Sequence, residues 1–253
     1  MELLVSVRNA TEAAVVAQHQ VAIVDIKEPA NGALGMPDPT VVTEILKQLP
    51  VDQTVSLALG ELADLTPEKV RDYFSRCKIP QPEIFAKIGL AGMNDDVNWP
   101  AKWGKVLNSM PDKVNHVAVA YADYSLAQSP LIDVVLKTGV RHGCQAMLLD
   151  TFTKTAGGSL DHVSLDELQR HLSFTNANGI RFVLAGSITS NVLSKVVDLN
   201  IDLIGVRGAV CESGVRTSSI SIVRLREFLS ELDEFSNRES AQGYKRKVVS
   251  EIT

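Results

Sequence analysis

"VAIVDIKEPANGALG", residues 21–35, joins a buried strand to two charges and a loop rich in Pro and Gly. Residues 21–24 and Ile26 are apolar on both faces, as in a parallel strand that is covered on both sides. Asp25 and Lys27 lie at the end of this strand. They share one face because alternate side chains of a strand point the same way. The stretch therefore predicts a parallel α/β fold with charged groups at the carboxyl end of a strand.

Similar apolar runs recur along the chain, and helical patterns separate them. The runs cover residues 3–7, 21–27, 53–60, 83–90, 115–123, 145–152, 180–187 and 201–210. Eight strands that alternate with helices favour a single (β/α)8 TIM barrel of the α/β class, with a doubly wound open sheet as the alternative. No linker divides the chain, so we expect one catalytic domain over residues 1–235. Residues 236–253 form a polar C-terminal tail.

Composition limits the partners and the compartment. The chain has 253 residues, 45% of them hydrophobic, and a net charge of −5. This charge gives no bulk attraction to nucleic acid or to an anionic membrane, and no apolar run is long enough to span a bilayer. Cys77, Cys144 and Cys211 are too few and too widely spaced for a disulfide framework or a zinc site. We therefore expect a cytoplasmic protein that binds neither nucleic acid nor membranes. We also expect it to form a homo-oligomer.

Three further charges fall at or just past the ends of predicted strands. Lys87 lies within the run 83–90. Asp150 lies near the end of the run 145–152, and Lys154 follows Asp150 by four residues. In a (β/α)8 barrel these ends meet at one mouth, where active sites are built, so the three should converge with Asp25 and Lys27. Each could instead be a solvated rim residue or part of a structural ion pair. Three lysines inside apolar runs are harder to explain that way, because an unpaired buried charge is costly.

Clustered lysines suit imine chemistry. A neighbouring cation and an apolar setting lower the pKa of an ammonium group, and the neutral amine can then attack a carbonyl to form a Schiff base. A nearby carboxylate, Asp25 or Asp150, can move the protons. The five histidines show no metal-binding spacing, and no P-loop, dinucleotide-binding or GxSxG motif occurs. The sequence therefore predicts a catalytic site that needs neither a metal nor an organic cofactor.

Small residues follow the last two predicted strands, in "LAGSI" (184–188) and "GVRGAV" (205–210). Backbone N–H groups of Gly186, Ser187 and Gly208 could hold a phosphate there, as in many such barrels, and Arg207 could add positive charge. A phosphorylated small molecule is the expected substrate.

These motifs together resemble the (5-formylfuran-3-yl)methyl phosphate synthase family. "LLVSV", "VDIKEPANGALG", "AKIGLAG", "AYAD", "LLDTFTKTAGGSL", "LAGSI" and "IGVRGAVC" match that family's motifs in order, over roughly residues 2–230. The resemblance implies a class I aldolase-like barrel that condenses two molecules of glyceraldehyde 3-phosphate into a phosphorylated furan aldehyde for methanofuran-type C1 cofactors. It assigns active-site roles to Lys27, Lys87, Asp150 and Lys154. Lys27 is our first choice for the imine, and Lys154 is the alternative.

Two other functions remain open at this stage. A generic class I aldolase or isomerase acting on another sugar phosphate would use the same lysines, acids and phosphate site. A barrel that binds a phosphorylated metabolite without catalysis would use only the phosphate site. The lysine cluster disfavours the second, because phosphate binding alone does not require lysines on strands distant from the glycine turns.

Overall fold

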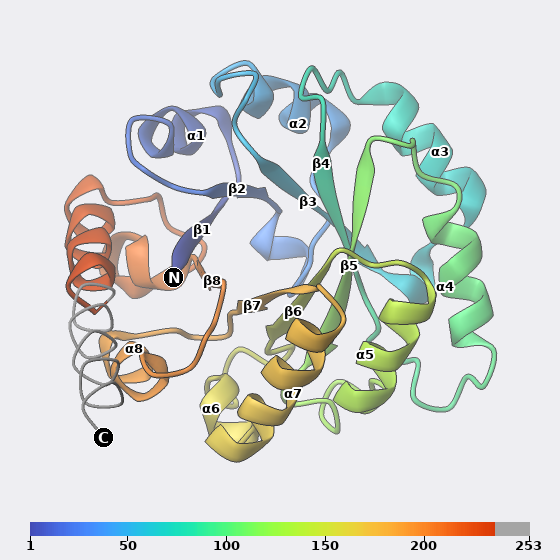
Figure 1. The fold of residues 1–253 in the computed structure, drawn as a ribbon. Coiled ribbons are helices and arrows are strands. Elements are labelled where there is room, and N and C mark those ends of the chain that lie inside the picture. Colours follow the sequence, from blue (N-terminus) through green and yellow to red (C-terminus); the bar gives the residue numbers. More distant parts are fainter. Residues whose placement is uncertain (236–253) are drawn as a thin grey trace, which may run out of the picture.

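Eight parallel strands close into one barrel in the computed structural model, which describes residues 1–235 (Figure 1). The strands are β1 (Glu2–Val7), β2 (Ile23–Ile26), β3 (Val55–Glu61), β4 (Ile84–Gly89), β5 (Val114–Tyr121), β6 (Ala146–Asp150), β7 (Arg181–Leu184) and β8 (Leu203–Val206). Each overlaps a predicted run, and β1 pairs with β8 to complete the ring. The predicted (β/α)8 barrel is confirmed, and the open-sheet alternative is wrong.

Helices surround the strands in Figure 1. They are α1 (Ala10–Val16), α2 (Pro39–Leu46), α3 (Pro67–Arg76), α4 (Trp99–Leu107), α5 (Ile132–Arg141), α6 (Ser159–His162), α7 (Leu165–Ala177) and α8 (Ser190–Val196), followed by a helical stretch over 222–235. Short 3-10 turns cover η1 (Pro29–Asn31), η2 (Leu62–Asp64), η3 (Gly208–Val210) and η4 (Glu212–Gly214). Side chains cap several helices. Asn9 accepts from the Glu12 amide, and Thr66 from the Lys69 amide. The predicted tail, 236–253, lies outside the described residues.

Two apolar layers hold the barrel together. The larger lies between the strands and the helices, and the smaller fills the barrel interior with residues such as Leu4, Val119 and Leu148. Strand register decides what stands above this interior layer. Ser6 of β1 and Ser56 of β3 both pair with Asp25 of β2, so a carboxylate lies between two hydroxyls at the carboxyl end of the barrel.

Two further features concern membrane-spanning helices and thiols in the described residues. Among residues 1–235, no helix combines the length and the apolar character needed to cross a membrane. Cys77, Cys144 and Cys211 are free thiols, and all three are buried.

Candidate active site

An ion pair across the barrel forms the floor of the site. Asp25 on β2 bonds to the Lys87 ammonium on β4, and both side chains are almost fully buried. Asp25 also accepts hydrogen bonds from Ser6 Oγ at 2.8 Å and Ser56 Oγ at 2.7 Å. Burial alone would raise the pKa of Asp25, but attraction to Lys87 and Lys27 and the hydrogen bonds from Lys87 and Ser56 hold it below the usual value. Asp25 is therefore ionised, and both its oxygens are occupied.

Lys27 follows β2 immediately and differs from the other lysines of the site. Its side chain is 9% exposed, and within residues 1–235 its Nζ makes no hydrogen bond or ion pair. Burial lowers its pKa to about 8, with Asp150 and Asp25 opposing the change and Lys87 and Lys154 adding to it. A useful fraction of this amine is uncharged near neutral pH.

Asp150 and Lys154 form a second ion pair at the end of β6. Lys154 Nζ lies 2.9 Å from Asp150 Oδ1, and it also donates to the Thr151 carbonyl. The Thr151 amide donates to the same carboxylate oxygen at 2.8 Å. Burial opposes ionisation of Asp150, but Lys154 and Lys27 outweigh it and lower its pKa to about 2. Asp150 is thus a permanent anion close to Lys27.

These groups surround one cavity of about 380 Å³, within the size range of small-molecule sites. All nine residues predicted for the site line it: Asp25, Lys27, Lys87, Asp150, Lys154, Gly186, Ser187, Arg207 and Gly208. The expected convergence of strand ends is therefore present in the structure. The chemical role of each residue stays a prediction.

The turn after β7 has the geometry of an anion cradle. Gly186 and Ser187 both have positive φ, +88° and +56°, and a Cβ on Gly186 would lie 2.3 Å from Ser159 Oγ. Ser159 fastens the turn, because its amide donates to the Gly186 carbonyl at 3.0 Å. In the described part of the chain, the amide N–H groups of Gly186 and Ser187 make no hydrogen bond. Both are available to a ligand.

Arg207 lies at the cavity edge, but its guanidinium is engaged by protein groups. It pairs with buried Glu12 at 2.8 and 3.1 Å and donates to the carbonyls of Ser6, Arg216 and Ser218. The predicted role of Arg207 in binding phosphate stays a prediction. Its bonds tie α1, β1 and the loop after β8 together.

Sequence reasoning missed Arg216, Ser6 and Ser56. Arg216 lies in the irregular loop after β8 and lines the cavity. No periodicity marks it, and the only available signal was an arginine in the loop after the last strand. The serines alternate correctly to face inward, but Ser is too common at strand positions to be selected without the register.

Asp123 is an acidic residue just beyond the end of β5, but it lies outside the cavity. Its two oxygens accept the amides of Phe152 and Thr153, each at 2.7 Å, and it does not line the cavity. It shapes the loop after β6 that carries Lys154.

Side chains from the ends of β3 and β5 contact one another on the side of the barrel away from the cavity. Tyr121 packs edge-on against Phe152, with ring centroids 5.3 Å apart, and belongs to the interior cluster with Leu34 and Ala91. Its hydroxyl donates to Glu61 Oε1 at 2.6 Å, and the Ala91 amide donates to Glu61 Oε2 at 2.9 Å. Burial raises the pKa of Glu61, which these hydrogen bonds partly offset. The cavity is therefore displaced toward β6, β7, β8, β1 and β2.

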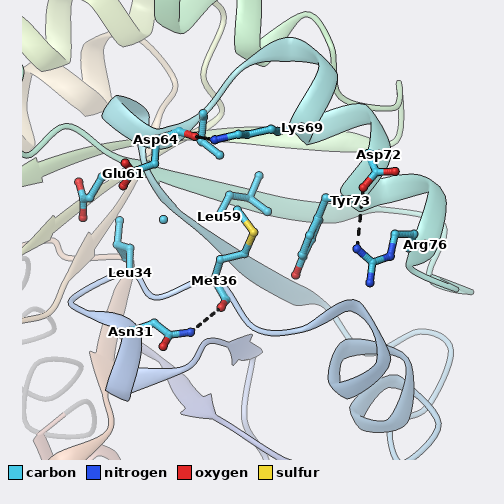
Figure 2. Close-up of a pocket in the computed structure, with 12 residues that line it drawn as sticks. Asn31, Leu34, Met36, Leu59, Glu61, Asp64, Lys69, Asp72, Tyr73 and Arg76 are labelled. Atoms are coloured by element: carbon cyan, nitrogen blue, oxygen red, sulfur yellow. Dashed lines mark hydrogen bonds and ion pairs between the residues drawn. The ribbon is translucent and has the colours of Figure 1, made fainter.

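A second cavity, of about 460 Å³, lies outside this wall between the end of β3, the loop after β2 and α3 (Figure 2). Figure 2 shows Glu61 and Arg76 at opposite ends of it. The basic side chains that line this cavity have local partners. Arg76 pairs with Asp72, and Lys69 donates to the Asp64 carbonyl. None of the predicted site residues lines it, so we place the chemistry in the first cavity.

Comparisons with known proteins agree with this architecture. Residues 3–229 match the family model described as 4-HFC-P synthase. The chain is 28% identical over 239 residues to "(5-formylfuran-3-yl)methyl phosphate synthase" of Methanobrevibacter smithii, covering 93% of this chain and 100% of that protein. It is 30% identical over 221 residues to the protein of the same name from Methanococcus maripaludis strain C5, covering 85% and 92%.

Solved structures support the fold. Phosphoribosyl anthranilate isomerase from Thermus thermophilus superposes with a TM-score of 0.58 at 15% identity, over 92% of this chain and 99% of that one. At this identity the likeness concerns the barrel alone.

Proposed function

Because the chain belongs to the 4-HFC-P synthase family, we propose that it condenses two molecules of glyceraldehyde 3-phosphate into (5-formylfuran-3-yl)methyl phosphate. Two triose phosphates contain the atoms of this product plus one phosphate and two water molecules, so no oxidant or reductant is needed. The observation that carries the proposal is Lys27, a buried amine without an ion pair in the described chain and with a pKa of about 8.

Lys27 acts as the nucleophile in this scheme. One triose phosphate isomerises in the site to its ketone form. The neutral Nζ adds to the ketone carbonyl, and water leaves to give an imine. Lys87 and Lys154 are less suited to this step because each ammonium is held in an ion pair with a buried carboxylate. Of the two lysines considered for the imine, Lys27 is therefore the better candidate.

The remaining charged groups handle protons and anions. A proton leaves C2 of the second triose phosphate and phosphate leaves its C3, which gives the enol of an α-keto aldehyde. C3 of this enol attacks the imine carbon of the first triose, so the new carbon–carbon bond forms at the branch point of the product. The C3 hydroxyl of the first triose then closes the ring on the C2 carbonyl of the second, and loss of water and of the Lys27 amine gives the furan and restores Lys27. We assign the proton transfers to Asp25 and Asp150. Lys87 and Lys154 stabilise the anionic intermediates and help to hold the Lys27 pKa low.

One phosphate is assigned to the turn after β7. The free amides of Gly186 and Ser187 supply donors without adding charge, and Gly208 lies beside them in the cavity wall. This leaves the carbonyl end of the first triose to face Lys27.

Product analysis tests the proposal. The purified protein is incubated with glyceraldehyde 3-phosphate alone, while near-ultraviolet absorbance and phosphate release are followed and the product is identified by mass spectrometry. We expect a furan aldehyde phosphate and one phosphate released per furan. Lys27→Ala should abolish turnover and the mass increase after borohydride trapping, with circular dichroism unchanged.

Lys27→Arg separates covalent from electrostatic roles, since it keeps the charge but cannot form the imine. Near-normal activity in this variant would contradict the Schiff base. Borohydride trapping by wild-type protein without furan formation would favour a class I aldolase or isomerase acting on another sugar phosphate. Binding without either result would favour a non-catalytic barrel.

The wider setting follows from the same proposal. The product would serve a methanofuran-type C1 cofactor, and the reaction would take place in the cytoplasm, where the three free thiols stay reduced. Homo-oligomer formation stays a prediction that analytical ultracentrifugation of the full chain checks.

A further inference from the structure

The charges that line the cavity do not all have partners. Five basic side chains line it: Lys27, Lys87, Lys154, Arg207 and Arg216. Three are in ion pairs with carboxylates, Lys87 with Asp25, Lys154 with Asp150 and Arg207 with Glu12. Within residues 1–235, Lys27 and Arg216 are in none. Lys27 must lose its charge to react, so Arg216 is the permanent cation that the described protein groups leave without a paired carboxylate.

The loop after β8 holds Arg216 at the cavity rim. Arg207 Nε donates to the Arg216 carbonyl at 2.5 Å, which fixes the backbone at this position. The Arg216 guanidinium is half-buried and makes one hydrogen bond, from Nη2 to the Gly32 carbonyl at 2.9 Å. Its other donors remain available, and this single bond orients the planar group between the loops that follow β2 and β8.

Arg216 retains its charge in this setting. Burial lowers its pKa, Asp150 and Glu28 oppose the change, and Arg207 adds to it. Arginine starts from so high a pKa that it stays protonated in proteins, and its planar fork binds phosphate oxygens in pairs.

We propose that Arg216 binds the phosphate of the second triose phosphate and so makes a second anion subsite in the cavity. The inference rests on the proposed function, because only a reaction that joins two phosphorylated molecules requires two such subsites. The Gly186–Ser187 turn holds the first phosphate with uncharged donors. The second phosphate binds at the rim through the free donors of Arg216.

Kinetics with a matched pair of variants test this subsite. Arg216→Gln removes the cavity charge. Arg8→Gln removes a different tie between the same two loops, since Arg8 donates to the Thr217 carbonyl at 2.7 Å and pairs with Glu28 at 3.3 Å without lining the cavity. For Arg216→Gln we expect KM for glyceraldehyde 3-phosphate to rise about 10- to 100-fold with a small change in kcat. Arg8→Gln should stay within about threefold of wild type.

Borohydride trapping with dihydroxyacetone phosphate identifies which phosphate is involved. Trapping requires only the first molecule, so Arg216→Gln should trap it as wild type does. An equal loss in trapping and in turnover would overturn the proposal, because Arg216 would then serve the first phosphate. An equal effect of Arg8→Gln on KM would also overturn it, since loop attachment and not charge would be responsible.

Titration with inorganic phosphate separates this proposal from the proposed function. We expect calorimetry to detect two phosphate sites in wild type and one in Arg216→Gln. Two sites without furan formation would refute the synthesis and leave the subsite standing. Furan formation with phosphate binding unchanged in Arg216→Gln would refute the subsite and leave the synthesis standing.

Discussion

In the proposed mechanism, burial makes the Lys27 amine reactive at the expense of stability. An ammonium group removed from water without a direct partner favours its neutral form, and the two buried carboxylates only partly restore the charge. The same burial that activates the amine therefore disfavours the folded state whenever the amine is protonated. Both consequences can be measured.

The first consequence concerns the pH dependence of the reaction. Because the pKa of Lys27 is about 8, kcat/KM should rise about tenfold per pH unit between pH 6 and 7 and level off above pH 8. Asp150→Asn should shift the inflection of the residual activity to lower pH, since Asp150 raises the Lys27 pKa. A flat profile from pH 6 to 8 would contradict the assignment of Lys27.

The second consequence concerns stability. The folded pKa of Lys27, about 8, lies below the ordinary lysine pKa of 10.5. The unfolded chain therefore binds the extra proton between these values, and stability rises with pH across this window. Below pH 8 the cost of the buried charge is fully present. Lys27→Met should therefore raise the free energy of unfolding at pH 7 by about 1–3 kcal/mol, measured by urea denaturation. A less stable variant would show that the lysine contributes more by its contacts than it costs.

Much of the site could be predicted at this scale, for a physical reason. Burying a charged side chain costs folding free energy. Charged residues inside apolar runs therefore indicate a functional role, and Asp25, Lys27 and Lys87 stand out for this reason. Arg216 does not, because it lies in a polar loop where an arginine is unremarkable. Its importance depends on which other cations are already paired, and only three-dimensional distances give that information.

At the scale of elements, the turn after β7 depends on a residue without a Cβ. Gly186→Ala would strain a positive φ and bring the new Cβ within 2.3 Å of Ser159 Oγ. Gly143 also has a positive φ, +68°, but nothing lies within 4 Å of a Cβ there. Gly143→Ala should lose about 1–2 kcal/mol of stability from the positive φ alone, and Gly186→Ala should lose more because its new Cβ also has a close contact. Only Gly186→Ala should also raise KM, by about tenfold, and equal KM values in the two variants would argue against the turn as a phosphate site.

The junction of α1 with the end of β8 depends on a buried ion pair. Glu12 and Arg207 are each 4% exposed, whereas the Glu2–Arg181 pair at the other end of the barrel is 58% and 42% exposed. Glu12→Gln leaves a buried guanidinium without its counter-charge and should cost about 3–5 kcal/mol, against less than about 1 kcal/mol for Glu2→Gln. Urea denaturation of the two variants gives the comparison, and similar losses would contradict it.

The type of each element could be predicted more reliably than the roles of the residues at its end. The β-runs were recognisable because strands covered on both faces need continuous Val, Ile, Leu and Ala. Arg207 was placed correctly at the end of β8, but its partner Glu12 lies on α1, almost the whole chain away in sequence. Only closure of β8 onto β1 brings them together, so a phosphate contact and a structural ion pair could not be distinguished beforehand.

At the scale of the whole molecule, the buried carboxylates make the barrel sensitive to acid. The folded pKa of Asp150 is about 2, and the pKa of Asp25 also lies below the ordinary aspartate value of 3.8. Their stabilising contribution is present above pH 4 and is lost as pH falls toward 2. Urea denaturation across this range should show a loss of about 2 kcal/mol for Asp150, and Asp150→Asn should show a shallower pH dependence. An unchanged slope in that variant would refute this contribution.

The cavity lies toward one side of the barrel mouth, away from the Tyr121–Glu61 contact, and this placement has a kinetic consequence. Lys27 is almost covered, whereas Arg216 lies at the more open rim. In the proposed reaction the two molecules would therefore occupy different depths on the same side of the barrel. The inner molecule must arrive first, and the outer one then blocks its escape. A compulsory order of addition follows from the proposal: dihydroxyacetone phosphate supplied for the inner position should be committed to product increasingly as the concentration of glyceraldehyde 3-phosphate rises.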